Sequence, residues 1–411
     1  MKLKYLFLSF VILGVLACDK NDDYEFVQVA TPQLMSKSAF RSAVEVSVPK
    51  TIDTPGKIYV YQDYIFVGDV NSGIHVIDNS KPESPKPIKF IEIPGNEDIS
   101  VKDNFLYADS ATDLVVFDIS DINNVSFVER LEDVFNVYDY NIPTEAEDVD
   151  FGGFNFEDDI IVGWTLTTER RKKEDNNLID IALDDSVVLN TAESATGTGG
   201  SLARFQVVDN YLYAVGNYEM AIFNIQNLAE PVYEDTQYAG WNIETMFQAE
   251  EYLYLGSTNG MYIYNLVNPA APAFVSEFTH WEGCDPVVVD GDYAYLTLRG
   301  GNLCWQLESV LEVIDISDKT KPTLAARYDL ENPYGLGIKN NMLYVCDGTA
   351  GLKLFERETP KDLKLVNALK GIQAKDVIPL ENSLILIGGN TLYQFEYIEN
   401  NVELISSYIL N

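Results

Sequence analysis

Few residues in this sequence could do acid–base, nucleophilic or metal chemistry in a recognised pattern. Its two histidines, His75 and His280, are far apart in the chain, so a zinc site of the His or Cys type is not expected. The sequence also lacks a nucleophilic-serine turn, a phosphate-binding glycine loop and a zinc-protease helix. We therefore predict no catalytic residue and favour a binding protein over an enzyme.

Carboxylates are the one chemical resource that the chain has in excess. Seven of them fall where loops follow strands and could ring one mouth of the fold: Asp69, Asp98, Asp109, Glu282, Asp285, Asp347 and Asp376. Asp98, Asp109 and Asp347 are weak metal candidates, and calcium is the one cofactor that they leave open. The simpler interpretation is that aspartates at strand ends cap turns. Two carboxyls about 5 to 9.5 Å apart would instead suit a glycan hydrolase or lyase, which is the alternative function.

The overall charge excludes one class of partner. There are 64 acidic and 28 basic residues, which gives a formal charge of −36. Nucleic-acid binding needs a basic surface, so we do not expect it. A glycan, a peptide or another protein remains as the partner, and any contact with a membrane is expected only through a lipid at the N-terminus.

The N-terminus has the pattern of an export signal. Lys2 and Lys4 precede an apolar run at 6–16, which is too short to span a bilayer. The run ends Val-Leu-Ala-Cys, which resembles a bacterial lipobox, and the acidic segment 19–23 resembles the export signal of Bacteroidota lipoproteins. We predict a signal peptide at 1–17, a lipidated Cys18 with a tether and extension over 18–50, and a surface-exposed outer-membrane lipoprotein. Plain secretion is the alternative.

The rest of the chain is a repeat of short strands. Seven copies of an alternating apolar segment that ends in Asp, Asn or Glu occupy 74–78, 114–118, 220–224, 261–265, 311–315, 352–356 and 392–396. The wide gap between the second and third copies has room for two units, and 154–164 is the candidate for the hidden one. This predicts eight units of about 40 residues. Seven units plus an irregular module is the alternative.

Each unit also contains turn signals. Asp103-Asn104 is a tight hairpin turn between apolar runs, and Pro-containing turns follow the third segment. Four antiparallel strands per unit, without a helical pattern, describe a propeller blade. We therefore predict an all-β fold, a β-propeller of about eight four-stranded blades over 51–411.

Two copies carry a recognisable motif. Leu-Val-Val-Phe-Asp-Ile-Ser-Asp at 114–121 and Leu-Glu-Val-Ile-Asp-Ile-Ser-Asp at 311–318 resemble the LVIVD repeat. That resemblance implies a secreted or surface β-propeller, and it carries no catalytic residues. The copies in the last two units depart from the motif because they end in Glu.

Large aromatic and charged residues gather in loops that propeller geometry places on one face. These loops connect one blade to the next or join the second strand of a blade to the third. The candidate ligand-binding residues are Trp241, Glu244, His280, Trp281, Glu282, Asp285, Trp305 and Tyr334. Aromatic loops near an axial pocket suit a sugar ring or a peptide side chain. The alternative is that the tryptophans only plug the channel.

A loop insertion is expected at about 165–200, between the second and third strands of the hidden unit. It joins a charged run, 169–175, to a Gly/Ser/Thr/Ala-rich segment, 191–201. A solvated, mobile loop is the simpler interpretation. The other is a lid, or a hook for an acidic partner.

Three cysteines follow Cys18. Cys284 and Cys304 fall in two loops of one blade on the same face, so we predict a disulfide between them in an oxidising envelope. Cys346 lies within an apolar strand and is expected to be a buried free thiol.

Overall fold

The computed structural model describes residues 24–135, 142–143, 145–172, 198–202, 204–280, 286–300 and 308–410. They belong to two compact units, residues 1–38 with 140–186 and residues 39–139 with 187–411. The predicted lipidation site Cys18 and the predicted Cys284–Cys304 pair lie outside the described residues. Trp281, Glu282, Asp285 and Trp305 also lie outside them.

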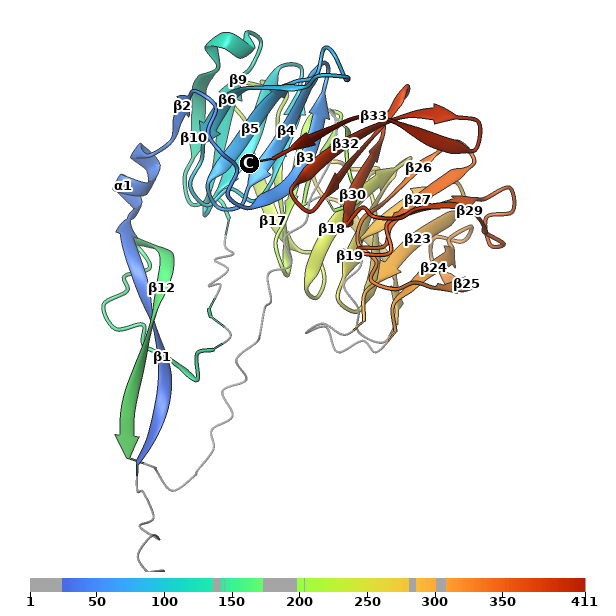
Figure 1. Cartoon of the computed structure of the whole chain (residues 1–411). Coiled ribbons are helices and arrows are strands. Elements are labelled where there is room, and N and C mark those ends of the chain that lie inside the picture. Colours follow the sequence, from blue (N-terminus) through green and yellow to red (C-terminus); the bar gives the residue numbers. More distant parts are fainter. Residues whose placement is uncertain are drawn as a thin grey trace, which may run out of the picture. The chain divides into compact units, whose positions relative to one another are not determined.

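The larger unit contains seven antiparallel sheets whose strands follow one another in chain order (Figure 1). The first four sheets are β3 (Pro55–Tyr61), β4 (Tyr64–Asp69), β5 (Gly73–Asp78) and β6 (Lys86–Glu92); β7 (Ile99–Lys102), β8 (Phe105–Ser110), β9 (Asp113–Asp118) and β10 (Ser126–Leu131); β14 (Phe205–Val208), β15 (Tyr211–Val215), β16 (Glu219–Asn224) and β17 (Val232–Tyr238); β18 (Ile243–Ala249), β19 (Tyr252–Ser257), β20 (Gly260–Asn265) and β21 (Ala273–Thr279). The last three are β22 (Val287–Asp290), β23 (Tyr293–Leu298), β24 (Val310–Asp315) and β25 (Thr323–Asp329); β26 (Leu336–Lys339), β27 (Met342–Cys346), β28 (Leu352–Glu356) and β29 (Lys364–Leu369); β30 (Ala374–Pro379), β31 (Ser383–Gly388), β32 (Thr391–Ile398) and β33 (Asn401–Ile409). All seven repeat copies found in the sequence are third strands of these sheets.

The repeat motif is explained by the corner that follows each third strand. In five sheets the terminal Asp or Asn side chain accepts a hydrogen bond from the amide two residues on, as in Asp118 with Ser120 (2.8 Å) and Asp315 with Ser317 (3.0 Å). This is an Asx turn, and it fixes the direction of the fourth strand. Hydrogen bonds from Ser120 lower the pKa of Asp118. The hairpin turn predicted at Asp103-Asn104 is also confirmed, with φ of 46° and 68°.

The sheets pack as consecutive blades of one ring, with their first strands innermost. Neighbouring first strands contact each other, and β7 of the second blade contacts β14 directly. One buried cluster joins Tyr107 and Leu114 of the second blade to Phe205 and Leu212 of the next. The predicted β-propeller is therefore confirmed, and of the two predicted blade counts the ring has seven.

The ring closes through side chains. Each blade is one continuous segment of chain, so the first and last blades share no strand. Ile58 and Ile65 of the first blade pack with Ile378 and Ile385 of the last. The fully buried Gln394 donates to Asn79 Oδ1 (2.7 Å) and accepts from Asn79 Nδ2 (3.0 Å) across the closure.

The smaller unit holds the segment predicted as a hidden blade. β12 (Asp159–Lys172) pairs antiparallel with β1 (Tyr24–Ser36), and β11 (Asp148–Val149) pairs parallel with β1, in a three-stranded sheet. Residues 154–164 therefore lie outside the ring, and the insertion begins after β10, between two blades. The prediction of a blade at 154–164 is wrong. β12 does have an apolar stretch typical of a strand, but the strand that it pairs with, β1, lies far away in the sequence near the N-terminus.

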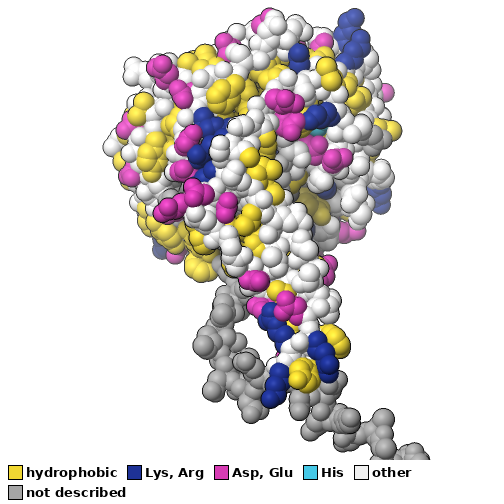
Figure 2. Space-filling view, turned by 90° about the vertical axis from the view of Figure 1, so that its left-hand side faces the viewer, with side chains coloured by type: hydrophobic (Ala, Val, Ile, Leu, Met, Phe, Trp, Pro, Cys, Tyr) yellow, Lys and Arg dark blue, Asp and Glu magenta, His cyan; other side chains and the backbone are white. Residues whose placement is uncertain are grey.

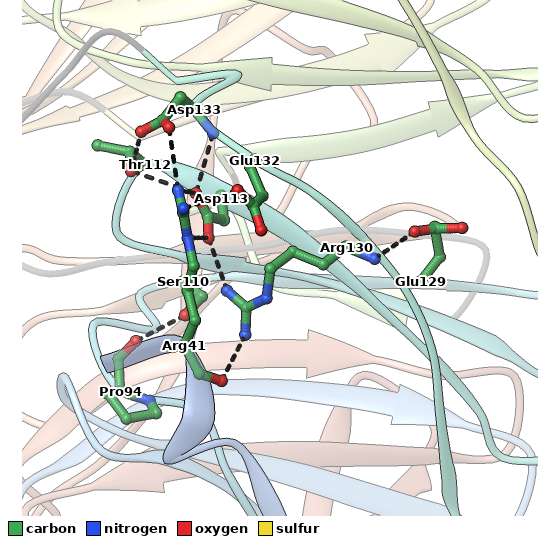
Figure 3. A network of polar contacts seen from close by, with 9 residues as sticks. All are labelled: Arg41, Pro94, Ser110, Thr112, Asp113, Glu129, Arg130, Glu132 and Asp133. Carbon is green, nitrogen blue, oxygen red and sulfur yellow. Dashed lines mark hydrogen bonds and ion pairs between the residues drawn. The ribbon is translucent and has the colours of Figure 1, made fainter. Parts of the chain in front are cut away.

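Residues 39–47, which belong to the larger unit, pack on the first two blades. β2 (Glu45–Ser47) adds to the outer edge of β6, and the short α1 (Lys37–Ser42) contributes Arg41. Arg41 makes two hydrogen bonds to the buried Asp113 (2.7 and 2.9 Å), and Arg130 makes a third (2.7 Å), as Figure 3 shows. These bonds outweigh burial and hold the pKa of Asp113 below its usual value. None of the helices in the described part of the chain is long and apolar enough to cross a membrane.

Candidate functional site

Two sets of loops share one face of the ring, as the sequence predicted. The loop between β15 and β16 meets the loop leading into β18, where Ile243 donates to the Asn217 carbonyl (2.8 Å). The same contact recurs between the first two blades, where Gly95 donates to the Asn71 carbonyl (2.9 Å). The inter-blade loops and the loops between second and third strands therefore form one continuous surface, which we call the loop face.

The central channel is occupied by the protein's own chain. β13 (Thr198–Gly199) pairs with the inner edge of β3. The next residue, Gly200, touches Asp376 of the seventh blade, and a Cβ added to it would come within 2.0 Å of that carboxylate. Ser201 then accepts a hydrogen bond from the Leu336 amide of the sixth blade (2.8 Å). Residues 198–202, here called the channel segment, therefore contact blades one, six and seven.

The channel segment corrects one expectation. The Gly/Ser/Thr/Ala-rich stretch 191–201 was expected to be solvated, yet Gly200 and Ser201 are buried. Small residues are needed here because the inner strands leave little room beside the axis. Composition alone could not separate that use of small residues from a flexible loop.

Four charged residues lie together near the start of inner strands, where the chain passes from the channel segment into β14. The Lys57 ammonium lies 3.1 Å from Asp98 Oδ2, and both side chains are almost fully buried. The same carboxylate oxygen accepts the backbone amides of Arg204 (2.7 Å) and Phe205 (3.1 Å), where the chain leaves the channel and begins β14. The Arg204 guanidinium pairs with Glu97 (2.8 Å). The roles of Lys57 and Arg204 were not predicted from the sequence, because the carboxylate partner of each belongs to a neighbouring blade.

Burial has the largest effect on the pKa of two aspartates next to these charged residues, Asp376 and Asp109. It raises the pKa of Asp376 to about 7, although the Val377 amide and the Lys57 ammonium act in the opposite direction. Burial and the Glu97 carboxylate raise the pKa of Asp109 to about 7. These carboxyls therefore take up protons near neutral pH. Their role in the structure, however, is to accept hydrogen bonds that hold neighbouring parts of the chain in place.

Three of the mouth aspartates have the same structural role. Asp69 accepts the amides of Asp53 and Thr54, Asp109 accepts those of Glu97 and Asp98, and Asp347 accepts those of Glu331 and Asn332, all at 2.7 to 3.1 Å. Each carboxylate thus fixes the segment of chain that leads into its own blade. His75 is buried 3.3 Å from Asp69 and stacks near Phe90, as expected of a packing residue. The turn-capping interpretation accounts for these aspartates.

No group of three or more His, Cys, Asp or Glu side chains among the described residues is arranged to hold a metal ion. The weak candidates Asp98, Asp109 and Asp347 are each engaged with amides, and Asp347 also pairs with Lys353 (2.5 Å).

Of the two candidate aromatic residues that the structure describes, Trp241 and Tyr334, Trp241 is the more exposed. Half of its surface is accessible, and its ring packs edge-on against Tyr218 with centroids 5.2 Å apart. Its amide donates to the Tyr262 hydroxyl (3.3 Å), which positions the loop. Glu244 follows at the start of β18 and is half-buried. An aromatic ring and a carboxylate therefore lie three residues apart where this inter-blade loop enters β18.

The next two inter-blade loops are braced by ion and ring contacts. His280 Nδ1 lies 3.1 Å from Glu312, which also pairs with Arg327 at 3.1 Å. Tyr334 is half-buried, and the Arg299 guanidinium lies 4.2 Å from the centre of its ring. The structure thus places Trp241, His280 and Tyr334 in three consecutive inter-blade loops on the loop face, each fixed by partners of its own.

The LVIVD repeat family matches this chain at residues 56–88, 96–133 and 284–330. These ranges fall on the first, second and fifth blades. The chain is a β-propeller that contains LVIVD repeats in three of its blades. No curated protein matches the sequence.

Solved structures similar to this LVIVD-repeat propeller share its fold at low sequence identity. A protein from Lactobacillus plantarum matches with a TM-score of 0.55 and 12% identity, over 87% of this chain and 97% of that one. The periplasmic gluconolactonase of Pseudomonas aeruginosa matches with a TM-score of 0.55 and 10% identity, over the same shares. Saccharomyces cerevisiae Sqt1 matches with a TM-score of 0.51 and 8% identity, over 90% of this chain and 88% of that one. At such identities the likeness concerns the propeller fold alone.

Proposed function

We propose that this LVIVD-repeat propeller is a surface-exposed lipoprotein that binds a glycan, a peptide or a protein on its loop face. The observation that carries the binding role is the filled channel. Because residues 198–202 occupy the axis, a partner has to be held by the exposed loops around it rather than inside the ring. Trp241 on its braced loop is the residue best suited to such a contact, since exposed aromatic rings supply much contact area on rigid scaffolds.

The lipid anchor is supported by the N-terminal sequence. The apolar run ends directly at Cys18, and an acidic segment follows it. A lipid chain would hold at the membrane a body whose charge of −36 otherwise favours solution.

The anchor and the location are tested together. Cells that produce the full chain are labelled with radioactive palmitate, and the label is expected in the wild type and lost in Cys18→Ser. Protease added to intact cells is expected to digest the wild-type protein. A protein that carries no label, or that resists protease until the cells are broken, contradicts the proposal.

The binding role is tested with Trp241→Ala. Purified protein is screened against immobilised envelope glycans and peptides, and a bound ligand is expected to lose at least about thirtyfold in affinity in this variant, as for an interface aromatic worth about 2 kcal/mol or more. Phe127→Ala is the matched control, because Phe127 is similarly exposed (48%) but belongs to β10, the fourth strand of its blade. Equal loss in both variants would argue against the loop face.

A glycan hydrolase or lyase is the second candidate. The raised pKa of Asp109 and Asp376, about 7 for each, is the feature that favours it. Their hydrogen bonds to the chain weigh against it, because a general acid must reach its substrate. Turnover of a glycan by the wild type that is abolished in Asp109→Asn would replace the binding proposal.

A further inference from the structure

The two faces of the β1–β12 ribbon differ sharply in charge near the end where Tyr24 pairs with Lys172. Directly opposite residues in an antiparallel pair point to the same face, and successive residues alternate. Tyr24 lies opposite Lys172, and Phe26 lies opposite Arg170, so these four side chains share one face. It carries two aromatic rings and two positive charges, and we call it the aromatic–basic face.

Among the residues that the structure describes at this end of the ribbon, the acidic side chains lie on the other face. Glu25 lies opposite Arg171, and Val27 lies opposite Glu169. Arg171 pairs there with Glu169 (3.0 Å) and with Asp148 of β11, so its charge is neutralised locally. The strand register thus separates charge within a chain that is strongly acidic overall.

The aromatic–basic face is open to solvent. Phe26 is 68% exposed and Tyr24 is 43% exposed. The Arg170 guanidinium lies 4.3 Å from the centre of the Tyr24 ring, so the cation and the aromatic ring form one surface. Basic side chains gather beside hydrophobic ones at this end of the ribbon (Figure 2).

The sequence places this face next to the proposed lipid. Only residues 19–23 separate Cys18 from Tyr24, and five extended residues reach at most about 20 Å. Aromatic rings combined with Arg and Lys are the side chains that favour the boundary between lipid headgroups and acyl chains. We propose that the aromatic–basic face lies on the membrane surface as a second contact beside the lipid, with anionic headgroups as its ligand; this rests on the proposed lipid anchor.

A membrane is a better occupant than a protein because the tether makes the contact intramolecular. A short linker raises the effective concentration of the bilayer at the ribbon, so a small face suffices.

The test uses the full lipidated protein in vesicles of phosphatidylcholine and phosphatidylglycerol. Tryptophan is placed on either face, as Phe26→Trp or as the matched control Glu25→Trp, one residue away along β1. The wild-type emission is subtracted, and quenching by acyl-chain-brominated lipid is measured. We expect at least twofold stronger quenching for Phe26→Trp. Equal quenching, or none, in protein that floats with the vesicles overturns the inference.

Charge variants give a second readout. Arg170→Gln on the Phe26→Trp background is expected to reduce the quenching, because one basic group near an anionic surface shifts the contact equilibrium by about fivefold. Arg171→Gln removes the same charge from the other face and is expected to leave the quenching unchanged. Equal effects of the two variants contradict the proposal. Protein that does not float with the vesicles at all shows instead that the lipid anchor itself is wrong.

Discussion

The ring closure provides the sharpest test of how this propeller is held together. No strand is shared between the first and last blades, so Gln394 and Asn79 bridge them with two hydrogen bonds of 2.7 and 3.0 Å. Gln394 also donates to the Pro82 carbonyl (3.2 Å) and is fully buried. The substitution Gln394→Ala removes all three bonds and leaves their partners without a bond from this side chain.

The expected effect is worked from these contacts. Each hydrogen bond contributes about 1 kcal/mol net, so Gln394→Ala is expected to lower the free energy of unfolding by about 3 kcal/mol, before any cavity is counted. Asn79→Ala removes two of the three bonds and should lose about 2 kcal/mol. Because the same two bonds are broken, the double variant should lose about 2 kcal/mol less than the sum of the single losses.

Urea unfolding followed by circular dichroism measures these losses. The control is Asn400→Ala, which breaks a hydrogen bond of 3.2 Å from this side chain to Glu356 between the seventh and sixth blades, at an exposed site. That variant should change stability by less than about 0.5 kcal/mol, since water replaces an exposed hydrogen bond. Additive losses in the Gln394 and Asn79 variants would refute the argument that this pair closes the ring.

Three further predictions concern buried charge and the channel. Asp113→Ala should lower the unfolding free energy in urea by about 3 to 5 kcal/mol, because it leaves Arg41 and Arg130 without their shared carboxylate; a loss under about 1 kcal/mol would contradict this. The folded-state pKa of Asp376 is raised to about 7, so its contribution to stability is full at low pH and is lost as the pH rises towards about 7. The free energy of unfolding of Asp376→Asn should therefore rise relative to that of the wild type, by up to about 1.4 kcal/mol per pH unit between about pH 5 and 7. A difference in unfolding free energy that stays constant with pH would show that Asp376 does not titrate in this range. Gly200→Val should displace the channel segment, because its Cβ would meet Asp376, and limited proteolysis between β12 and β14 should become faster; an unchanged cleavage rate would argue against a filled axis.

The blades could be predicted from the sequence because their signals are local. The alternation of residues 114–118, the Asp118 corner and the Asp103-Asn104 turn are all encoded within one unit. The same holds for the loop face, since the order of strands in a blade decides which loops meet. Trp241 and Tyr334 were therefore placed correctly on it.

The remaining features depend on partners distant in the sequence. The pairing of β12 with β1 joins residues 159–172 to residues 24–36, and nothing in either segment specifies the other. The position of Gly200 against Asp376 likewise depends on the closed ring. Lys57 was not predicted as part of the site because its carboxylate partner, Asp98, belongs to the next blade.

The channel segment also has a consequence for how the chain reaches its folded state. The inner edge of β3 is completed only by Thr198 and Gly199, which emerge long after the first blade has been synthesised. Until then β3 presents a row of unpaired backbone groups, and such an edge readily adds a strand from another chain. A chain with this topology therefore has a period, before the second blade is followed by the third, in which self-association competes with folding.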